Sequence, residues 1–261
     1  MNSTDYTGKR VVVTGCSSGV GAATAKMLGA LGAEVIGLSR REPTEPVAQF
    51  HEVDLASPES IEAAVRDIQA PIDALFNCAG APPTLSSLEI VRVNFLGPRL
   101  LTEMIVPLMP SGSAIVSVSS SNAAGWRNRV DLLRGFVETD GFDEGVAWYE
   151  ANVDEAGHGY PFSKEALTVW ALALAGELVT RGIRSNLVSP GVVQTPLLEA
   201  AQQAFPPEML AGSLRPSGRP STVDEQAAPL LFLNSSAASY VNGADLAVDG
   251  GYSALFATSG S

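Results

Sequence analysis

Short runs of apolar, β-branched residues alternate with helical patterns along the whole chain. The runs occupy residues 10–14, 34–38, 50–53, 72–76, 114–118, 183–188 and 244–248, and each reads as a buried strand. Between them the pattern predicts helices over 19–31 and around residues 62, 100, 170 and 228. Strands that alternate with helices form parallel sheets covered on both faces. The chain is therefore predicted to be an α/β protein with a doubly wound, seven-stranded parallel sheet.

No linker, internal repeat or low-complexity tract divides the chain. Its 261 residues suit one large α/β domain, so residues 1–261 are expected to form a single domain. Two segments depart from the regular alternation, an insertion at 127–156 and a candidate lid at 192–217. In doubly wound folds, ligands bind outside the carboxyl ends of the strands. The motifs described below all lie at such ends.

Three glycines mark the turn between the first strand and the first helix. They are Gly15, Gly19 and Gly21, spaced G-x-x-x-G-x-G rather than in the more common G-x-G-x-x-G order. Gly15 allows the tight turn, Gly19 lets the backbone approach a pyrophosphate, and Gly21 lets helix and strand pack closely. The free N–H groups of the helix N-terminus then face the phosphates, as in a Rossmann-type dinucleotide site. The other loop residues expected at the cofactor are Ser17, Ser18 and Val20.

A tyrosine and a lysine stand four residues apart at the start of the helix around residue 170. Tyr160 and Lys164 therefore share one helix face, with Cβ atoms about 5–6 Å apart. A phenol has a pKa near ~10 in water, too high for proton exchange at neutral pH. A neighbouring ammonium stabilises the phenolate and lowers its pKa, so Tyr160 is a candidate general acid and base. Because such pairs also arise by chance in helices, the assignment needs support from the rest of the chain.

Charge and composition exclude several classes of partner. With 16 basic and 28 acidic residues, the net charge is −12 at pH 7, which opposes binding to nucleic acid or anionic lipid. There is no apolar run near the roughly 20 residues of a membrane helix and no signal-peptide pattern, so a cytoplasmic protein without membrane contact is expected. The two cysteines give no disulfide framework. No metal site is expected, because His51 and His158 are isolated; His158 is interpreted as a surface residue.

In order and content, the motifs resemble those of the short-chain dehydrogenase/reductase family. The resemblance runs from Gly8 to Gly251 and so covers nearly the whole chain. It implies an NAD(P)(H)-dependent oxidoreductase that moves a hydride between a nicotinamide and an alcohol or carbonyl substrate. Within the family, the chain is most similar to bacterial 3α-hydroxysteroid dehydrogenase/carbonyl reductases and coniferyl-alcohol dehydrogenases, which share a long insertion. The matching motifs are Thr14 to Gly21, Asn77-Cys78-Ala79-Gly80, Asn94, Ser120, Tyr160 with Lys164, and Pro190-Gly191.

The resemblance implies a catalytic role for each of three polar side chains. Ser120 is expected to hydrogen-bond and orient the substrate oxygen, with Ser119 and Ser121 as close alternatives. Tyr160 is expected to donate a proton to the carbonyl oxygen in reduction and to take one from the alcohol in oxidation. Lys164 is expected to lower the pKa of that tyrosine and to hold the nicotinamide ribose.

A proline four residues after Asn94 permits an inference from the residues themselves. Pro98 has no N–H to bond the Asn94 carbonyl, so the helix is expected to kink and leave that carbonyl free for a water. An asparagine at this place in the family anchors a water that relays protons from the lysine to solvent. Asn94 is therefore expected to be a fourth catalytic residue; a kink without catalytic meaning is the alternative.

Further cofactor contacts are implied at the ends of the third, fourth and sixth strands. Asp54 resembles the family's adenine contact, whereas Asn77 and Ala79 resemble contacts to the cofactor ribose. The stretch after the sixth strand resembles the one whose backbone and threonine meet the carboxamide. The full set of these positions is Asp54, Leu55, Asn77, Ala79, Gly80, Pro190, Gly191, Val193 and Thr195.

The end of the second strand indicates which nicotinamide cofactor is favoured. NAD-binding folds place an acid there for the ribose 2′-hydroxyl, and NADP-binding folds place basic residues there for the 2′-phosphate. This chain has Ser39, where NAD-dependent family members commonly carry Asp, followed by Arg40 and Arg41. Arg40 offers a phosphate a planar, charged fork of donors. NADP(H) is therefore expected, with NAD(H) possible because Ser18 replaces a second basic residue of many NADP-dependent relatives.

The insertion sets the chain apart from most of the family. Ser120 and Tyr160 are 40 positions apart, and the intervening residues are rich in aromatic and acidic side chains. The insertion is expected to cap the mouth of the active site and to favour a homodimer over the family's common homotetramer. Its acids suggest substrates with a positive charge, such as amino alcohols. The residues expected to contact substrate are Ser120, Asn122, Trp126, Trp148, Tyr160, Leu198, Phe205 and Met209.

These observations predict an alcohol dehydrogenase/carbonyl reductase for a bulky, aromatic or alicyclic secondary alcohol or ketone. One alternative is a 3-oxoacyl thioester reductase, which the acidic surface and the insertion disfavour because acyl-carrier proteins are themselves acidic. A second alternative is a non-catalytic dinucleotide sensor. Such a protein would be expected to lose the tyrosine or the lysine, and this chain has both.

Overall fold

A seven-stranded parallel sheet lies at the centre of the protein. The computed structural model describes residues 5–204 and 212–258. The strand order is β3-β2-β1-β4-β5-β6-β7, so the order reverses between β1 and β4, where doubly wound folds open a ligand crevice. All seven predicted strands are confirmed, with ends shifted by at most two residues. Their bounds are β1 (Arg10–Thr14), β2 (Glu34–Ser39), β3 (Gln49–Glu52), β4 (Ala74–Asn77), β5 (Ala114–Val118), β6 (Arg184–Pro190) and β7 (Asp245–Val248).

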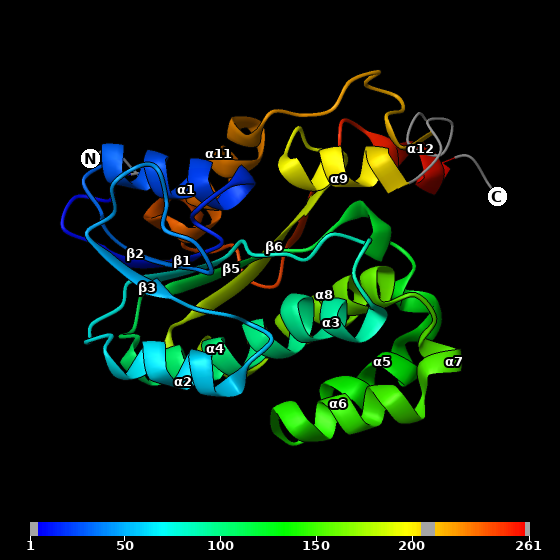
Figure 1. Ribbon diagram of the computed structural model, residues 1–261. Coiled ribbons are helices and arrows are strands. Elements are labelled where there is room, and N and C mark those ends of the chain that lie inside the picture. Colours follow the sequence, from blue (N-terminus) through cyan, green and yellow to red (C-terminus); the bar gives the residue numbers. More distant parts are fainter. Residues whose placement is uncertain (1–4, 205–211, 259–261) are drawn as a thin grey trace.

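Helices cover both faces of the sheet (Figure 1). One face carries α1 and α11, and the other carries α2, α4 and α8, with the short helix α3 packed against α8. These helices confirm the five predicted from the sequence. Their bounds are α1 (Gly19–Ala30), α2 (Pro58–Arg66), α3 (Ser87–Val91), α4 (Gly97–Ile105), α8 (Gly159–Leu178) and α11 (Val223–Asn234). In the described residues, no helix has the length and apolar character to cross a membrane.

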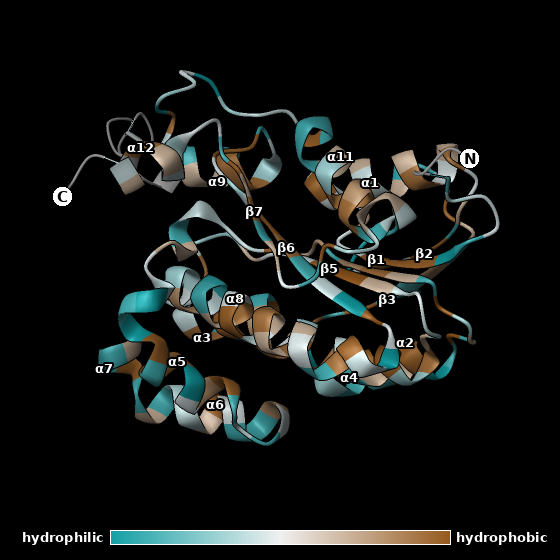
Figure 2. Ribbon diagram, turned by 180° about the vertical axis from the view of Figure 1, so that it is seen from behind, coloured by the Kyte–Doolittle hydropathy of each residue, from teal (hydrophilic) through white to brown (hydrophobic). Residues whose placement is uncertain are grey.

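The alternation of side chains along each strand divides the core in two. On β1, Val12 belongs to the core beneath α2, α4 and α8, whereas Val11 and Val13 belong to the core beneath α1 and α11. All three valines are fully buried. Figure 2 shows hydrophobic residues, in brown, along β1, β2 and β5 in the middle of the sheet. Burial of both sheet faces leaves the strand ends as the place where polar groups gather.

The insertion forms a small helical layer outside α8. Its helices are α5 (Val130–Val137), α6 (Gly141–Ala151) and α7 (Val153–Ala156), which lie together at the lower right of Figure 1. The ring of Phe136 lies 4.9 Å from that of Phe95 and 5.1 Å from that of Phe162, between ring centroids. The aromatic side chains of the insertion therefore extend the main core outward from α8.

A buried arginine of α4 ties the insertion to the rest of the protein. Arg99 is only 2% exposed, and its guanidinium donates to the carbonyls of Val137 and Thr139, each at 3.2 Å. It also donates to the Thr139 hydroxyl and to the Gly141 carbonyl. The nearest carboxylate, that of Glu103, is 3.8 Å away and half exposed. The charge of Arg99 is thus satisfied chiefly by the backbone of the loop between α5 and α6.

Replacing Arg99 with methionine is expected to loosen the insertion. Arg99→Met leaves several buried acceptors without donors, so we expect the free energy of unfolding to fall by about 3 kcal/mol. Urea denaturation measures the loss, and amide hydrogen exchange should show it concentrated in residues 130–156. Arg134→Met is the control, because its ion pair with Glu138 is exposed and should change stability by less than about 0.5 kcal/mol. Similar effects of the two variants would contradict this view of Arg99.

Candidate active site

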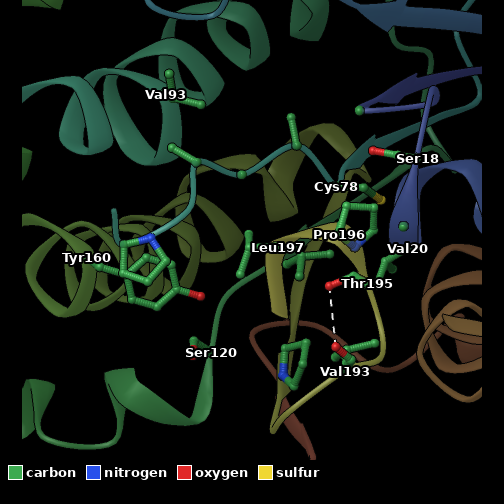
Figure 3. Close-up of a pocket in the computed structure, with 18 of the residues that line it drawn as sticks. Ser18, Val20, Cys78, Val93, Ser120, Tyr160, Val193, Thr195, Pro196 and Leu197 are labelled. Carbon is green, nitrogen blue, oxygen red and sulfur yellow. Dashed lines mark hydrogen bonds between the residues drawn. The ribbon is translucent and has the colours of Figure 1, made fainter. Parts of the chain in front are cut away.

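A cavity of about 610 Å³ opens at the carboxyl ends of the central strands. It is lined by the loop between β1 and α1, the ends of β2, β4, β5 and β6, and the start of α8. Figure 3 shows Tyr160 and Ser120 on one side of this cavity and Ser18 and Cys78 on the other, with Leu197 between them. Every residue expected at the cofactor lines the cavity except Gly21 and Asn77.

The glycine loop is shaped by close approaches that exclude side chains. Gly15 has φ +72°, and a Cβ there would lie 2.9 Å from the Cα of Ala79. A Cβ on Gly21 would overlap the carbonyl oxygen of Gly15, so this glycine allows α1 to begin directly against the end of β1. Gly19 has φ +58°, and a Cβ there would meet the methyl group of Thr195 at 3.3 Å. The loop therefore forms a narrow backbone cradle between the β4 and β6 ends.

A threonine at the end of β1 holds the neighbouring β4 turn in place. The hydroxyl of Thr14 accepts from the N–H groups of Cys78 and Ala79, each at 3.0 Å. Both of those residues line the cavity. The sequence analysis included Thr14 in the glycine-loop motif but gave it no role. The position of Thr14 at the end of a predicted strand was the feature that could have indicated this role.

The side chain of Asn77 is buried behind the cavity. It is 3% exposed, and its amide donates to the hydroxyls of Thr102 at 3.0 Å and Ser117 at 3.3 Å. Asn77 is the last residue of β4, and its side chain points into the polar interior of the sheet rather than into the cavity. Its contribution to the cavity is therefore through the turn that follows it.

The end of β2 presents hydroxyl and guanidinium groups to the cavity. The hydroxyls of Ser17 and Ser39 are hydrogen-bonded at 2.8 Å, which joins the glycine loop to this strand. Arg40 and Arg41 line the same end of the cavity and are exposed. Within the described residues, neither guanidinium has a carboxylate partner within 4.0 Å. Both arginines are thus available to an anion.

Tyr160, Ser120 and Lys164 converge at the opposite end of the cavity. Burial raises the pKa of Tyr160, and a hydrogen bond with Ser120 acts in the opposite direction. The Lys164 ammonium is 4% exposed and donates to the Val118 carbonyl at 2.7 Å. Burial lowers its pKa to about 8. The expected lowering of the tyrosine pKa by lysine is absent from this arrangement, because the ammonium is directed to the backbone of β5.

Asn94 lies directly behind this group rather than in the cavity wall. Its side-chain oxygen accepts from the Ala81 N–H at 2.7 Å, and its amide donates to the Ser163 hydroxyl at 3.3 Å. A Cβ on Gly80 would lie 3.6 Å from the Asn94 oxygen and 3.9 Å from the Lys164 ammonium. Where Pro98 predicted a kink, residues Arg92–Leu96 form a π-helical turn.

The residues expected to contact substrate fall into three groups. Ser120, Asn122, Tyr160 and Leu198 line the cavity, the last from α9 (Pro196–Ala204). Trp126 and Trp148 do not line it, and neither does any residue of 127–156, so the structure shows no direct contact of the insertion with the cavity. The ring of Trp148 instead stacks on Phe162, with 6.1 Å between centroids. The expected contacts Phe205 and Met209 lie outside the described residues.

His158 lies at the cavity, a position that the sequence analysis did not predict. His158, interpreted from the sequence as a surface residue, lines the cavity beside Tyr160. Its position two residues before the tyrosine was the signal for this placement.

The C-terminal helix α12 (Tyr252–Thr258) lies near α9 at the same edge of the sheet (Figure 1). Across residues 5–204 and 212–258, no group of three or more His, Cys, Asp or Glu side chains is arranged to hold a metal ion.

Comparison with known proteins identifies the class to which this fold and site belong. Residues 9–129 match the short chain dehydrogenase family model, and residues 148–253 match a model described as enoyl-(acyl carrier protein) reductase. The chain belongs to the short-chain dehydrogenase/reductase family. It is accordingly an oxidoreductase that acts on alcohols or ketones and binds NAD(P).

Individual relatives match over nearly their full length. Coniferyl-alcohol dehydrogenase of Pseudomonas sp. strain HR199 is 37% identical, with 96% of this chain and 98% of that protein covered. The 3-alpha-hydroxysteroid dehydrogenase/carbonyl reductase of Comamonas testosteroni is 34% identical, with 94% and 96% covered. The crystal structure of 3-alpha-hydroxysteroid dehydrogenase from Pseudomonas sp. B-0831, complexed with NADH, has a TM-score of 0.81 at 30% identity, with 96% and 99% covered.

The lysine in the cavity is expected to titrate near pH 8 in the free protein. Burial lowers its pKa to about 8 from an ordinary 10.5, so Lys164 becomes neutral above pH 8 while the unfolded chain keeps its proton. Stability should therefore rise with pH across this window. The chain has three lysines, so 13Cε NMR resolves the titration, with exposed Lys9 and Lys26 as internal references. Assignment follows from the signal lost in Lys164→Met, and its failure to titrate near pH 8 would count against the buried ammonium.

Proposed function

We propose that this protein interconverts a bulky, aromatic or alicyclic ketone and its secondary alcohol, with NADP(H) favoured over NAD(H). The observation that carries the proposal is the meeting of Tyr160, Ser120 and Lys164 in one cavity with the glycine loop. The names of the similar proteins, which refer to coniferyl alcohol and hydroxysteroids, support a substrate with a ring system. Apolar groups of Val192, Leu197 and Leu198 line the cavity and suit such a body.

The residues present fit a nicotinamide dinucleotide. Side chains are excluded at Gly15 and Gly21 by backbone atoms, which leaves a cradle narrow enough for a pyrophosphate to meet N–H groups. At one end of this cradle, Arg40 and Arg41 would hold a 2′-phosphate. At the other end, the cavity reaches Lys164, which would hold the nicotinamide ribose. The nicotinamide, when bound, supplies or accepts the hydride.

The tyrosine hydroxyl would handle the proton of the reaction. In reduction, the substrate carbon gains a hydride and the Tyr160 hydroxyl gives its proton to the carbonyl oxygen; oxidation reverses both transfers. Ser120, whose hydroxyl acts to lower the pKa of Tyr160, would orient the same oxygen. Burial keeps the phenol protonated, as suits a proton donor. The phenolate left after transfer needs an ammonium beside it, which Lys164 provides if it turns from the Val118 carbonyl.

The substrate is proposed to be neutral at the end that reaches His158 and Asn122. The amino-alcohol expectation depended on acids of the insertion, and none of those residues lines the cavity. The one carboxylate among the described lining residues is Asp54, which lies at the end of β3. A charged amine would therefore find no counter-charge near Tyr160.

The catalytic assignment is tested by removing one hydroxyl. Tyr160→Phe removes the transferable proton and little else, so we expect kcat to fall at least about a hundredfold with nearly unchanged cofactor affinity. The measurement is NADPH absorbance at 340 nm over aromatic and alicyclic ketones, with fluorescence titration for binding. Lys164→Ala should reduce both properties. A phenylalanine variant that keeps more than about a tenth of wild-type kcat would refute the role of Tyr160.

Cofactor preference is tested at the end of β2. Arg40→Ala removes a charge-assisted contact to the 2′-phosphate, so affinity for NADPH should fall by roughly 10- to 100-fold while that for NADH changes little. Calorimetric titration with both cofactors measures the difference. Arg134→Ala, on the exposed surface of the insertion, is the matched control. The similar hydroxysteroid dehydrogenase was solved with NADH, so both cofactors must be compared in the wild type. A wild-type kcat/KM that is equal or higher with NADH than with NADPH would reverse the proposed preference.

A further inference from the structure

The histidine just before α8 has one ring nitrogen hydrogen-bonded to the backbone, and the other has no partner among the described residues. His158 is the N-cap of α8, and its Nδ1 accepts from the Tyr160 N–H at 3.1 Å. An imidazole nitrogen that accepts a hydrogen bond carries no hydrogen, so in the neutral ring the hydrogen is on Nε2. The imidazole lines the cavity and is exposed. His158 therefore presents an N–H donor beside Tyr160.

We propose that His158 determines substrate specificity by donating a hydrogen bond from Nε2 to a second oxygen of the substrate. The inference rests on the proposed function and deepens it. The reacting oxygen is already served by Tyr160 and Ser120, so the partner of His158 is a separate acceptor, such as an ether or hydroxyl oxygen on the ring system. Because Nδ1 is occupied, the ring can recognise only acceptors at this position.

The turn that carries His158 is fastened on both sides. There is no room for a side chain at Gly159, because the carbonyl oxygen of Ser87 occupies that space. A turn held in this way keeps the imidazole in one place, so that its donor can discriminate between substrates. Three side chains, from the 3-10 turn Trp126–Arg129 and from α6 and α3, make the contacts: Arg129 to the Ala156 carbonyl (2.8 Å), Tyr149 to the Gly157 carbonyl (3.2 Å), and Ser87 from the Gly159 N–H (3.1 Å).

Through these contacts the insertion supports the turn before His158, although the insertion itself does not line the cavity. Arg129 and Tyr149 both belong to the 127–156 segment, yet neither lines the cavity. They act on the backbone immediately before His158. The insertion therefore contributes to substrate choice as a support for this turn, whereas His158 is the residue that meets the substrate.

Two substitutions of His158 test the roles of its two ring nitrogens separately. His158→Asn keeps an acceptor at the place of Nδ1 and so keeps the helix cap, but it has no donor at the place of Nε2. His158→Gln carries an amide N–H near the place of Nε2 and lacks the cap acceptor. The test substrates are 4-methoxyacetophenone and 4-ethylacetophenone, with the 3-substituted pair alongside. Within each pair, size is matched and only one member has the second oxygen.

The loss in His158→Asn should depend on the substrate. We expect kcat/KM to fall roughly three- to tenfold more for the methoxy ketone than for the ethyl ketone, mainly through KM. Comparing variant and wild type for each ketone cancels their intrinsic reactivities. His158→Gln should keep most of the wild-type preference for the methoxy ketone despite a lower Tm. Equal losses for both ketones in His158→Asn, no loss for either, or a lost preference in His158→Gln would overturn the inference.

Failure of the proposed function remains distinguishable from failure of this inference. If the wild-type protein reduces neither ketone, the proposed function fails for aromatic ketones. The same pairs are then titrated by calorimetry into the NADP+-loaded wild type and His158→Asn. A methoxy-over-ethyl preference in affinity that His158→Asn loses supports the donor role of His158, and absence of that preference overturns it.

Discussion

The close approach of helix α1 to strand β1 is the constraint on which the cavity depends. Any side chain at position 21 would collide with the carbonyl oxygen of Gly15, so this junction requires glycine. The turn places the first N–H groups of α1 over the carboxyl edge of the sheet, where an anion gains from the helix dipole. The Thr14 hydroxyl accepts hydrogen bonds from the Cys78 and Ala79 N–H groups, and these bonds fix the turn after β4 relative to β1. The glycine loop and the β4 turn that line the cavity are thus one connected piece of backbone.

Burial sets the electrostatics at the other end of the cavity. It favours the neutral forms of both Tyr160 and Lys164, raising the pKa of the phenol and lowering that of the ammonium. The Val118 carbonyl holds the ammonium by a hydrogen bond, and behind it Asn94 is fixed between Ala81 and Ser163. Burial and these hydrogen bonds together hold the lysine side chain at the end of β5.

The sequence predicted the sheet and the loops of the site well, because these features follow from local patterns. Buried parallel strands are continuous apolar runs in the sequence. A glycine at a strand end indicates a tight turn or a close backbone approach at that one position. What local patterns do not determine is the direction of individual side chains. Asn77 ends a strand, and nothing local says whether its amide faces the cavity or the interior. Trp148 is aromatic and close in sequence to Tyr160, yet its ring stacks on Phe162 in the hydrophobic core and does not line the cavity.

The insertion illustrates how a segment can affect a site that it does not touch. Its aromatic rings pack on the outer side of α8, while Arg129 forms an ion pair with Glu165 at 3.1 Å, one residue beyond Lys164. Burial raises the pKa of Glu165, and the arginine opposes that rise. A buried pair of this kind contributes little net stability, but removing either member leaves a costly unpaired charge. It therefore fixes the register between the insertion and the catalytic helix, and with it the position of the turn that brings His158 to the cavity.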